Sequence, residues 1–383
     1  MLRVCHIASG DTWGGAEAQV ATLIKTLAQS GEVDVCAIIL NEGRLAQELR
    51  ALAIEVRVIS ERHNSLRKIF ATAQEFIAQR AVHIIHSHRY KENLLAVWLA
   101  AGNPKLRLVR TQHGLPEKHS GIAGLKQKTA YAIDRFTGRF SANKAIAVSE
   151  DVLKYLTGYI SADKVRLVPN GIDLNLVRCP WSKSEAKKML GIGKDEFVIG
   201  FAGRLERVKR PDLFISVCRH LVSRSENIRF VVAGDGRLQA QVESLIGSFG
   251  LTSKVLLLGH RNDSYAVLRA MDLLLLTSDH EGLPMVMLEA MWLGTPVASR
   301  AVGGVIEVIV NGETGILLQD ADPVAIAETC LVLQKDPALR EKISSAARTL
   351  IARKYSATRN CDLVLDLYSS LTSQQCAARL AIA

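Results

Sequence analysis

Short apolar runs alternate with segments of helical length along the chain, and the series occurs twice. Each run is roughly four to seven residues long and rich in Val, Ile and Leu, which is typical of strands buried on both faces of a parallel sheet. Successive parallel strands need a crossover, which is usually a helix. The alternation therefore predicts an α/β fold whose sheets are covered by helices on both faces.

The series breaks at residues 168–183, where an Asn-Gly turn and a proline stand in a stretch of little periodicity. The predicted strands are 2–8, 33–39, 55–59, 82–86, 106–111, 144–148 and 165–168 before the break, and 197–203, 228–233, 254–258, 272–277, 296–299 and 314–318 after it. The predicted helices are 16–29, 66–79, 92–101, 124–140, 211–223, 237–249, 263–270, 285–292, 323–334 and 337–352. We therefore expect two doubly wound Rossmann-like domains, 1–172 and 173–355, with ligands bound where strand ends face an interdomain cleft.

The composition is that of a folded protein without a membrane span, a disulfide framework or a zinc site. With 48% hydrophobic and 22% charged residues, the chain is expected to fold, and it has no apolar run of the ~20 residues that span a bilayer. The seven cysteines are scattered and never spaced as CxxC, so we expect reduced thiols in the cytoplasm and no zinc site. Residues 1–172 hold 23 basic and 15 acidic residues, which is +8 of the net charge of +10. The first half is therefore expected to meet an acidic partner, or to carry a solvated basic face.

Two loops after predicted strands carry glycines or cations. In GDTWGGAE, Gly14 and Gly15 open the first helix, whose free amides attract anions. The pattern is not GxGxxG, so a nicotinamide site is poorly supported, and a plain strand-to-helix turn is the alternative. In the second series, Gly203 ends a strand and is followed by Arg204 and Lys209. Both cations can converge on one phosphate, although a solvated loop carries the same residues.

The stretch EGLPMVMLE places Glu281 before a short apolar helix and Glu289 about two turns further on. Carboxylates accept hydrogen bonds from sugar hydroxyls, so a nucleotide sugar with its diphosphate at this helix start would meet both. For Glu289 alone, an exposed helix face is the simpler interpretation. The Asp-x-Asp at 320–322 precedes a proline and is interpreted as helix capping instead of a metal site.

These motifs resemble those of the retaining GT-B glycosyltransferases of family four, the E-x7-E type. The matching residues, in order, are Gly14-Gly15-Ala-Glu17, Val168-Pro-Asn-Gly-Ile-Asp173, Gly203-Arg204 with Lys209, Gly234-Asp-Gly236, Glu281-Gly-Leu-Pro, Glu289-Ala-Met, Gly294-Thr-Pro-Val, Gly303-Gly304 with Glu307, and the NGETG stretch at 311–315. The resemblance covers nearly the whole chain. It implies that the first domain binds the acceptor, that the second binds the donor, and that a C-terminal helix within 356–383 crosses back to the first domain.

The resemblance also implies a role for each motif. Arg204, Lys209, Glu281 and His113 would form the catalytic set, with the two cations on the donor diphosphate and with Glu281 and His113 at the transferred sugar. The other donor-binding residues would be Gly14, Gly15, Gly203, Gly234, His260, Arg261, Gly282, Leu283, Pro284 and Glu289, and those on the acceptor side would be Trp13, Glu17, His88 and Arg89. Because cations and helix amides would stabilise the leaving group, no metal or other cofactor is expected. Retention would follow the front-face route proposed for the family, in which the donor phosphate helps to deprotonate the acceptor.

Residues 116–144 hold six basic and two acidic residues, with apolar positions at helical spacing. Such a helix lies on an anionic membrane, or else it is a surface helix of the first domain. Together with the basic first half, it favours a peripheral protein on the inner face of the plasma membrane.

We therefore expect a hexosyltransferase that moves a UDP- or GDP-linked sugar to a glycolipid, a lipopolysaccharide or a surface polysaccharide. Another GT-B enzyme, such as a sugar-nucleotide epimerase or a disaccharide synthase, is the alternative. Nucleic-acid binding is disfavoured, because aromatic residues make up only 5% and no recognition motif appears. The oligomeric state stays open.

Overall fold

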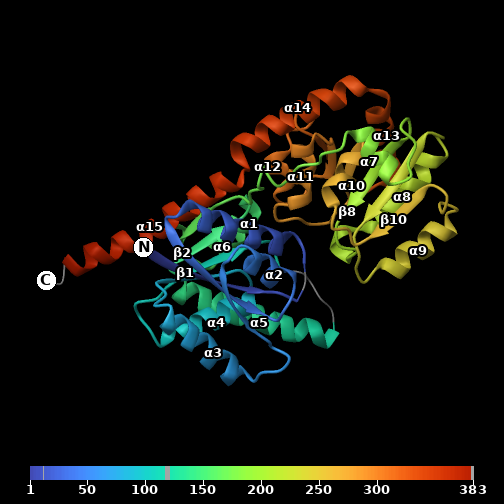
Figure 1. Cartoon of the computed structure of the whole chain (residues 1–383). Coiled ribbons are helices and arrows are strands. Elements are labelled where there is room, and N and C mark those ends of the chain that lie inside the picture. The colour runs from blue at the N-terminus through green and yellow to red at the C-terminus, as the bar shows by residue number, and fades with distance from the viewer. Residues whose placement is uncertain (12, 117–120, 381–383) are drawn as a thin grey trace. The chain divides into compact units, whose positions relative to one another are not determined.

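The computed structural model describes residues 1–11, 13–116 and 121–380, with side chains described throughout these ranges except at 121–127 and 372–380. The chain divides into two compact units (Figure 1). Unit 1 comprises Met1–Gly171 and Ala357–Ala383, and unit 2 comprises Ile172–Ser356. Two doubly wound α/β units are the fold class that the sequence predicts.

Unit 1 is built on a parallel sheet of seven strands in the order β3-β2-β1-β4-β5-β6-β7. The strands are β1 (Leu2–Ser9), β2 (Val33–Leu40), β3 (Glu55–Ile59), β4 (Ile84–Ser87), β5 (Arg107–Gln112), β6 (Lys144–Ala147) and β7 (Val165–Leu167). The chain winds outward from β1 to β3 and then in the opposite direction from β4 to β7. The winding therefore reverses between β1 and β4, which is the point where sheets of this kind bind their ligands.

Helices cover both faces of this sheet because alternate strand residues point to opposite sides. Val4 and Ala8 of β1 pack in one core with α1, α2 and α15, whereas Cys5 and Ile7 pack in another with α3 and α4. The helices of unit 1 are α1 (Gly15–Ser30), α2 (Arg44–Ala51), α3 (Leu66–Gln79), α4 (Tyr90–Ala101), α5 (Gly121–Ser141), α6 (Glu150–Thr157) and α15 (Ala357–Leu380), with a 3-10 turn η1 (Ala162–Lys164). Helix α4 packs between α3 and α5 (Figure 1).

The C-terminal helix α15 is bound into unit 1 by polar contacts as well as by its apolar face. Asn360 donates to the Pro169 carbonyl at 2.6 Å and accepts from Gln19 of α1 at 3.1 Å. Tyr368 is fully buried against the sheet. The chain passes from one unit to the other after Gly171 and after Ser356. These two segments run side by side, because the amide of Ile172 donates to the Tyr355 carbonyl at 2.9 Å.

Unit 2 has a parallel sheet of six strands in the order β10-β9-β8-β11-β12-β13, and its winding reverses between β8 and β11. The strands are β8 (Phe197–Ala202), β9 (Ile228–Ala233), β10 (Val255–Gly259), β11 (Leu273–Leu276), β12 (Val297–Arg300) and β13 (Ile316–Leu318). The helices are α7 (Lys183–Met189), α8 (Pro211–Val222), α9 (Gln239–Ser248), α10 (Ser264–Ala270), α11 (Met285–Leu293), α12 (Val305–Val308), α13 (Pro323–Lys335) and α14 (Pro337–Lys354), with a 3-10 turn η2 (Arg207–Lys209).

Three further predictions concern the cap of α13, the cysteines and the presence of a membrane-spanning segment. Asp322 caps α13 by accepting from the amides of Val324 and Ala325 at 3.1 and 3.3 Å, as its position before a proline predicts. Within the residues with described side chains, the six cysteines are all free thiols; Cys376 lies outside that range. No helix among the described residues has both the length and the apolar character of a membrane span.

Candidate functional site

The reversal point of unit 2 brings together the loop after β8 and the loop after β11. Three hydrogen bonds join these loops: Thr277 Oγ1 donates to the carbonyls of Lys209 and Arg210 at 3.0 and 2.9 Å, and the Asp279 amide donates to the Val208 carbonyl at 2.8 Å. Thr277 is fully buried. The end of the loop that carries Lys209 is therefore held against β11 instead of moving freely in solvent.

Lys209 and Glu281 form a close ion pair at this point. Lys209 Nζ donates to both carboxylate oxygens of Glu281, at 2.6 and 2.7 Å, and Ser278 Oγ donates to Oε1 at 2.6 Å. Glu281 is only 6% exposed, so its charge depends on these two partners for compensation. Arg204 lies on the same loop as Lys209 and is exposed. The structure thus brings Lys209 and Glu281 together, and Ser278 joins them.

Glycines allow the loops around this ion pair to pack backbone against backbone. A Cβ on Gly234 would lie 2.0 Å from the Gly203 carbonyl oxygen, and one on Gly303 would lie 1.7 Å from the Glu281 carbonyl oxygen. Gly303 also has φ +51°, and the Gly304 amide donates to the Gly282 carbonyl at 2.8 Å. Larger residues would push the loops apart. Gly234 and Gly303 are therefore required for loop packing.

Glu289 lies on α11 and is half-buried. It makes no hydrogen bond or ion pair that the structure shows among the described residues. Desolvation raises the pKa of its carboxyl from 4.5 to about 7. The interpretation of Glu289 as a solvated surface charge is thus wrong. A half-buried carboxyl with unused acceptors can take hydrogen bonds from a ligand.

The remaining predicted donor residues differ in their surroundings. Leu283 and Pro284 are buried at the start of α11, where Pro284 is the N-cap residue and not part of the first turn. His260 is exposed after β10, which lies at the edge of the sheet, two strands from β8. Arg261 donates to both oxygens of Asp263, at 2.7 and 2.6 Å. Its guanidinium is therefore already paired with a carboxylate.

The reversal point of unit 1 gathers the predicted acceptor-side residues. His88 and Arg89 follow β4, and Arg89 is hydrogen-bonded to the buried carboxylate of Glu17 on α1. Gly14 is the N-cap of α1, and Gly15 is its first residue. The Cζ atom of the Arg44 guanidinium lies over the Trp13 ring, 4.3 Å from the ring centroid. Trp13 is therefore engaged by packing within unit 1.

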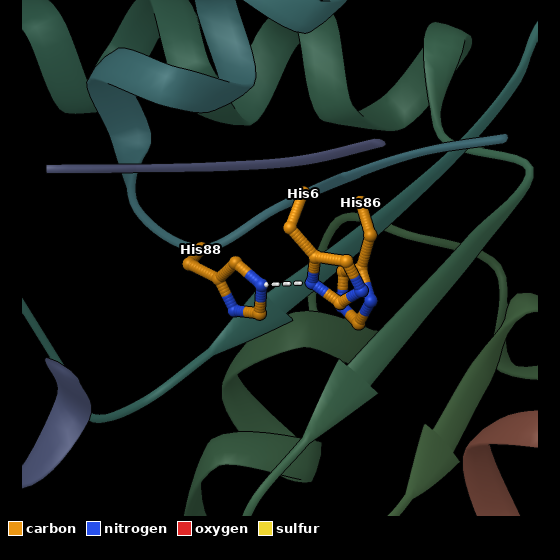
Figure 2. Close-up of side chains that lie close together, drawn as sticks. All are labelled: His6, His86 and His88. Carbon is orange, nitrogen blue, oxygen red and sulfur yellow. Dashed lines mark hydrogen bonds between the residues drawn. The ribbon is translucent and has the colours of Figure 1, made fainter. Parts of the chain in front are cut away.

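A hydrogen-bonded chain of buried side chains ends at His113. Figure 2 shows three of its rings, with His6 Nδ1 2.9 Å from His88 Nε2. His6 and His86 are register partners on β1 and β4, and His88 follows two residues later on the same face. We call the set the histidine chain; in order, its members are Thr111, His86, Tyr368, His6, His88 and His113.

The histidines of this chain are uncharged at neutral pH. Burial lowers the pKa of His6 and of His113 from 6.5 to about 3. Burial and the neighbouring histidines hold the pKa values of His86 and His88 well below 6.5. His86 lies within β4, in agreement with the strand predicted at 82–86. Sequence reasoning left out His6 and Tyr368, although the H-x-H spacing at 86–88 places two rings on one sheet face.

Helix α5 covers most of the basic stretch predicted at 116–144. Residues 117–120 lie outside the described residues, as do the side chains of 121–127. Beyond them, three large apolar side chains face outward: Ile133, Phe136 and Phe140 are 47%, 69% and 66% exposed. The exposed cations Arg135 and Arg139 alternate with them. The described part of α5 thus has a mixed apolar and basic outer surface.

Comparisons with known proteins agree with this architecture. Residues 13–176 match the profile of Glycosyltransferase Family 4, and residues 182–350 match that of Glycosyl transferases group 1. A D-inositol 3-phosphate glycosyltransferase of Xylanimonas cellulosilytica is 28% identical over 76% of this chain and 73% of its own length. An Escherichia coli UDP-Gal:alpha-D-GlcNAc-diphosphoundecaprenol alpha-1,3-galactosyltransferase is 28% identical over 74% of each chain.

Among solved structures, the Anabaena HepE protein in complex with UDP-glucose aligns with a TM-score of 0.85 and 20% identity, over 97% of this chain and all of that one. This likeness extends across both units and supports the fold. The two profile matches together cover most of the chain, one in each unit. The chain therefore belongs to the glycosyltransferases of the GT-B fold.

Proposed function

We propose that this glycosyltransferase moves a hexose from a nucleotide diphosphate sugar to a phosphate-bearing acceptor such as a glycolipid or a lipid-linked precursor of lipopolysaccharide or surface polysaccharide. We further propose that the reaction retains the anomeric configuration by the front-face route and needs no metal ion. The observation that carries the proposal is the Lys209–Glu281–Ser278 cluster at the strand ends of unit 2, where α/β sheets bind their ligands.

The donor diphosphate is assigned to Arg204 and Lys209. An ammonium group has three donors, so Lys209 can keep Glu281 and still donate to a phosphate oxygen. Arg204, exposed on the same loop, would add a guanidinium fork. Two cations at the β-phosphate would stabilise the charge that develops as the sugar leaves, which is the role a metal ion has in other transferases.

The sugar and the ribose are assigned to the two carboxylates. Glu281 is fixed by Lys209 and Ser278, so it would present a rigid acceptor to hydroxyls of the transferred sugar. Glu289 has acceptors without a partner among the described residues, and ribose hydroxyls would fill them. HepE was solved with UDP-glucose, which favours a UDP-linked sugar as the donor.

The acceptor is assigned to unit 1 on the basis of charge and of its relatives. The names of two relatives give a phosphorylated inositol and a diphosphoundecaprenol-linked sugar as their acceptors. Residues 1–172 carry an excess of eight positive charges, from 23 basic and 15 acidic residues, and this charge would attract a phosphorylated acceptor. His88 and Arg89 lie at the strand ends of this unit and are proposed to face it, and His113 is proposed to contact the transferred sugar.

A lipid-linked acceptor would require the enzyme to work at a membrane surface. The outer surface of α5 carries Phe136, Phe140 and two arginines, and Trp98 of the adjacent α4 is 51% exposed. Aromatic and basic side chains of this kind bind anionic interfaces. We propose that the protein is cytoplasmic and associates through this surface with the inner face of the plasma membrane.

A thermal-shift panel of UDP, GDP, ADP and their sugars tests the donor assignment, because a ligand stabilises the native state by RT ln(1 + [L]/Kd). We expect one base to shift Tm and the Arg204→Ala variant to lose most of that shift. Transfer to a lipid-diphosphate sugar acceptor, followed by NMR of the new anomeric centre in the presence of EDTA, tests retention and metal independence. The proposal is wrong if no nucleotide shifts Tm, and inversion or loss of activity in EDTA would overturn the corresponding part.

A further inference from the structure

The six groups of the histidine chain are joined end to end. The Thr111 hydroxyl lies 2.7 Å from His86 Nε2, and His86 Nδ1 lies 2.6 Å from the Tyr368 hydroxyl. That hydroxyl is 3.5 Å from His6 Nε2. The chain continues from His6 Nδ1 to His88 Nε2 at 2.9 Å, and it closes at 3.2 Å between His88 Nδ1 and the Nε2 of the last histidine. Every step is a direct side-chain contact.

His113 ends the chain with an unused nitrogen. Its Nδ1 atom is buried and has no hydrogen-bond partner among the described residues. A buried polar atom without a partner is uncommon and calls for an explanation, such as a ligand or an ordered water. His113 follows β5 directly, at the strand ends where ligands of such sheets bind.

The chain couples the tautomers of its members. A neutral imidazole has one N–H and one acceptor nitrogen, so the direction of one proton sets the direction of the next. Three arrangements use all five contacts. One of them, in which Tyr368 accepts from both His86 and His6, leaves the proton of a fully buried hydroxyl without an acceptor and is costly. Two arrangements remain. In one, Thr111 donates to His86 and all four imidazoles carry their proton on Nδ1. In the other, all four carry it on Nε2, and Thr111 accepts from His86.

Thr111 and His113, at the two ends of the histidine chain, determine which arrangement is more stable. In the second, the Thr111 hydroxyl proton needs another acceptor, but His86 is the one hydrogen-bond partner of that hydroxyl among the described residues. Thr111 is 5% exposed, so the lost hydrogen bond would be costly. In the first arrangement every proton within the chain has an acceptor, and the N–H of His113 at Nδ1 is left to be filled by a ligand.

We propose that the histidine chain fixes His113 in the Nδ1–H tautomer, so that His113 donates a hydrogen bond to an oxygen of the bound sugar. His88, His6, Tyr368, His86 and Thr111 are then positioning residues for the transferase reaction. The inference rests on the proposed function for the identity of the ligand, but the tautomer itself does not depend on it.

A metal ion at His6, His86 and His88 is the alternative occupant, since one nitrogen from each lies within 4.8 Å of the others. Zinc at 2.0–2.1 Å from each nitrogen in a tetrahedral site would hold them about 3.3 Å apart. The His6–His88 contact of 2.9 Å is shorter and matches a hydrogen bond. Both nitrogens of His86 already contact hydroxyl oxygens at 2.7 and 2.6 Å. The distances therefore favour hydrogen bonding over metal binding.

Long-range ¹H–¹⁵N NMR of the ¹⁵N-histidine-labelled full chain tests the tautomers directly. We expect Nδ1–H in His6, His86, His88 and His113. In Tyr368→Phe the chain is cut between His86 and His6, and we expect His113 to show a mixture of tautomers. Nε2–H in these histidines of the wild type would overturn the proposal, as would stoichiometric Zn²⁺ binding that shifts all of their resonances together.

Turnover provides the second readout. With UDP-glucose, or the donor that the thermal-shift panel selects, we expect Tyr368→Phe to lower kcat about tenfold while the Kd of the nucleotide stays unchanged, as for the loss of one hydrogen bond at the reacting sugar. Tyr355→Phe is the matched control, because its hydroxyl donates to the Glu307 carbonyl in unit 2. An unchanged kcat with unchanged tautomers would refute the chain. If no donor is turned over at all, the proposed function is wrong. The NMR experiment still tests the tautomer of His113 independently.

Discussion

Lys209 and Arg204 lie on one loop of unit 2, but their side chains have different surroundings. Lys209 is the counter-ion of a carboxylate that is almost completely buried, whereas Arg204 is exposed. Removing one partner of a buried pair leaves an uncompensated charge, which costs far more than removing an exposed side chain. The same alanine substitution should therefore have different consequences at the two positions.

We expect Lys209→Ala to lower the free energy of unfolding by ~3 kcal/mol and also to weaken donor binding. Arg204→Ala should change stability by less than ~1 kcal/mol and still weaken donor binding by roughly 10- to 100-fold, the value of a charge-assisted hydrogen bond. Urea unfolding and titration calorimetry with the donor measure the two effects. Arg353→Ala, on the exposed side of α14, is the control. Equal stability losses at 204 and 209 would contradict the assigned difference.

Glu289 should release a proton when the donor binds. Its pKa of about 7 leaves the free carboxyl half-protonated at pH 7, and hydrogen bonds from ribose hydroxyls favour the ionised form. Binding of UDP-glucose should therefore release about half a proton at pH 7. Calorimetry in buffers of different ionisation enthalpy measures this release.

Glu289→Gln supplies the control for the proton count. A glutamine cannot titrate, so the buffer dependence of the binding enthalpy should disappear in this variant. Proton release that persists in Glu289→Gln would place the titrating group elsewhere.

For single residues, the sequence predicts which side chains take part in the site better than it predicts their burial and contacts. The spacing of the glutamates and the order of the glycines pointed to Glu281 and Lys209, which the structure joins at 2.6 Å. The sequence did not predict that Glu289 is half-buried or that Tyr368 contacts His86. Burial and contacts between residues separated by 282 positions arise only when distant elements pack together.

The described part of helix α5 exposes large apolar side chains. Phe136 and Phe140 are about two-thirds exposed, at 69% and 66%, while its one described acid, Asp134, is buried against Arg110. The outward face of its described part therefore combines apolar side chains with exposed cations, of which Arg135 also lies over the rings of Tyr155 and Tyr159. The inner side of α5 is held by its packing on α4 and by the ion pair between Asp134 and Arg110 of β5.

Phe136→Ser with Phe140→Ser, and separately Arg135→Glu with Arg139→Glu, should each weaken binding to vesicles that contain anionic phospholipid at least tenfold. Donor binding should be unaffected, because unit 2 is unchanged. Vesicle co-sedimentation measures the effect. Val332→Ser, at an exposed apolar position of α13, is the matched control. If the control loses as much binding as the α5 variants, or if none of them loses any, the membrane surface is wrongly assigned.

Elements with strong periodicity were predictable, and short ones were not. The sequence predicts β3 and α3 with the bounds that the structure shows, because each has a full run of alternating or helical apolar positions. It omits α2, α6 and α7, which are only eight, eight and seven residues long. A helix of two turns offers too few positions for a 3.6-residue period to be recognised, so packing decides its conformation.

The two units should respond to mild acid in different ways. In unit 1, the folded pKa of His6 and of His113 is about 3, against 6.5 when unfolded. The unfolded state then binds more protons below pH 6.5, so unit 1 loses stability as pH falls from 6.5 toward 3. In unit 2, the raised pKa of Glu289 has the opposite effect: stability is gained as pH falls from 7 to 4.5.

Hydrogen exchange detected by mass spectrometry at pH 7.5 and 5.5, corrected for intrinsic exchange, can follow β1 and β8 separately. We expect protection in β1 to fall by roughly 1.4 kcal/mol per titrating histidine at pH 5.5, and protection in β8 to be kept or to rise. His113→Asn should reduce the loss in β1, and His63→Gln, at an exposed position, should not. Equal losses in β1 and β8 would contradict the assignment of these groups.

Helix α15 gives unit 1 an unusual order of assembly during translation. Tyr368, which lies between His86 and His6, leaves the ribosome only after all of unit 2 has been synthesised. Until then the nascent sheet exposes its apolar face and the two ring nitrogens, on His86 and His6, that Tyr368 contacts in the folded unit. A chaperone that shields the growing chain would thus have a natural substrate here, and early termination before α15 would leave a protein with a complete unit 2 and an unfinished unit 1.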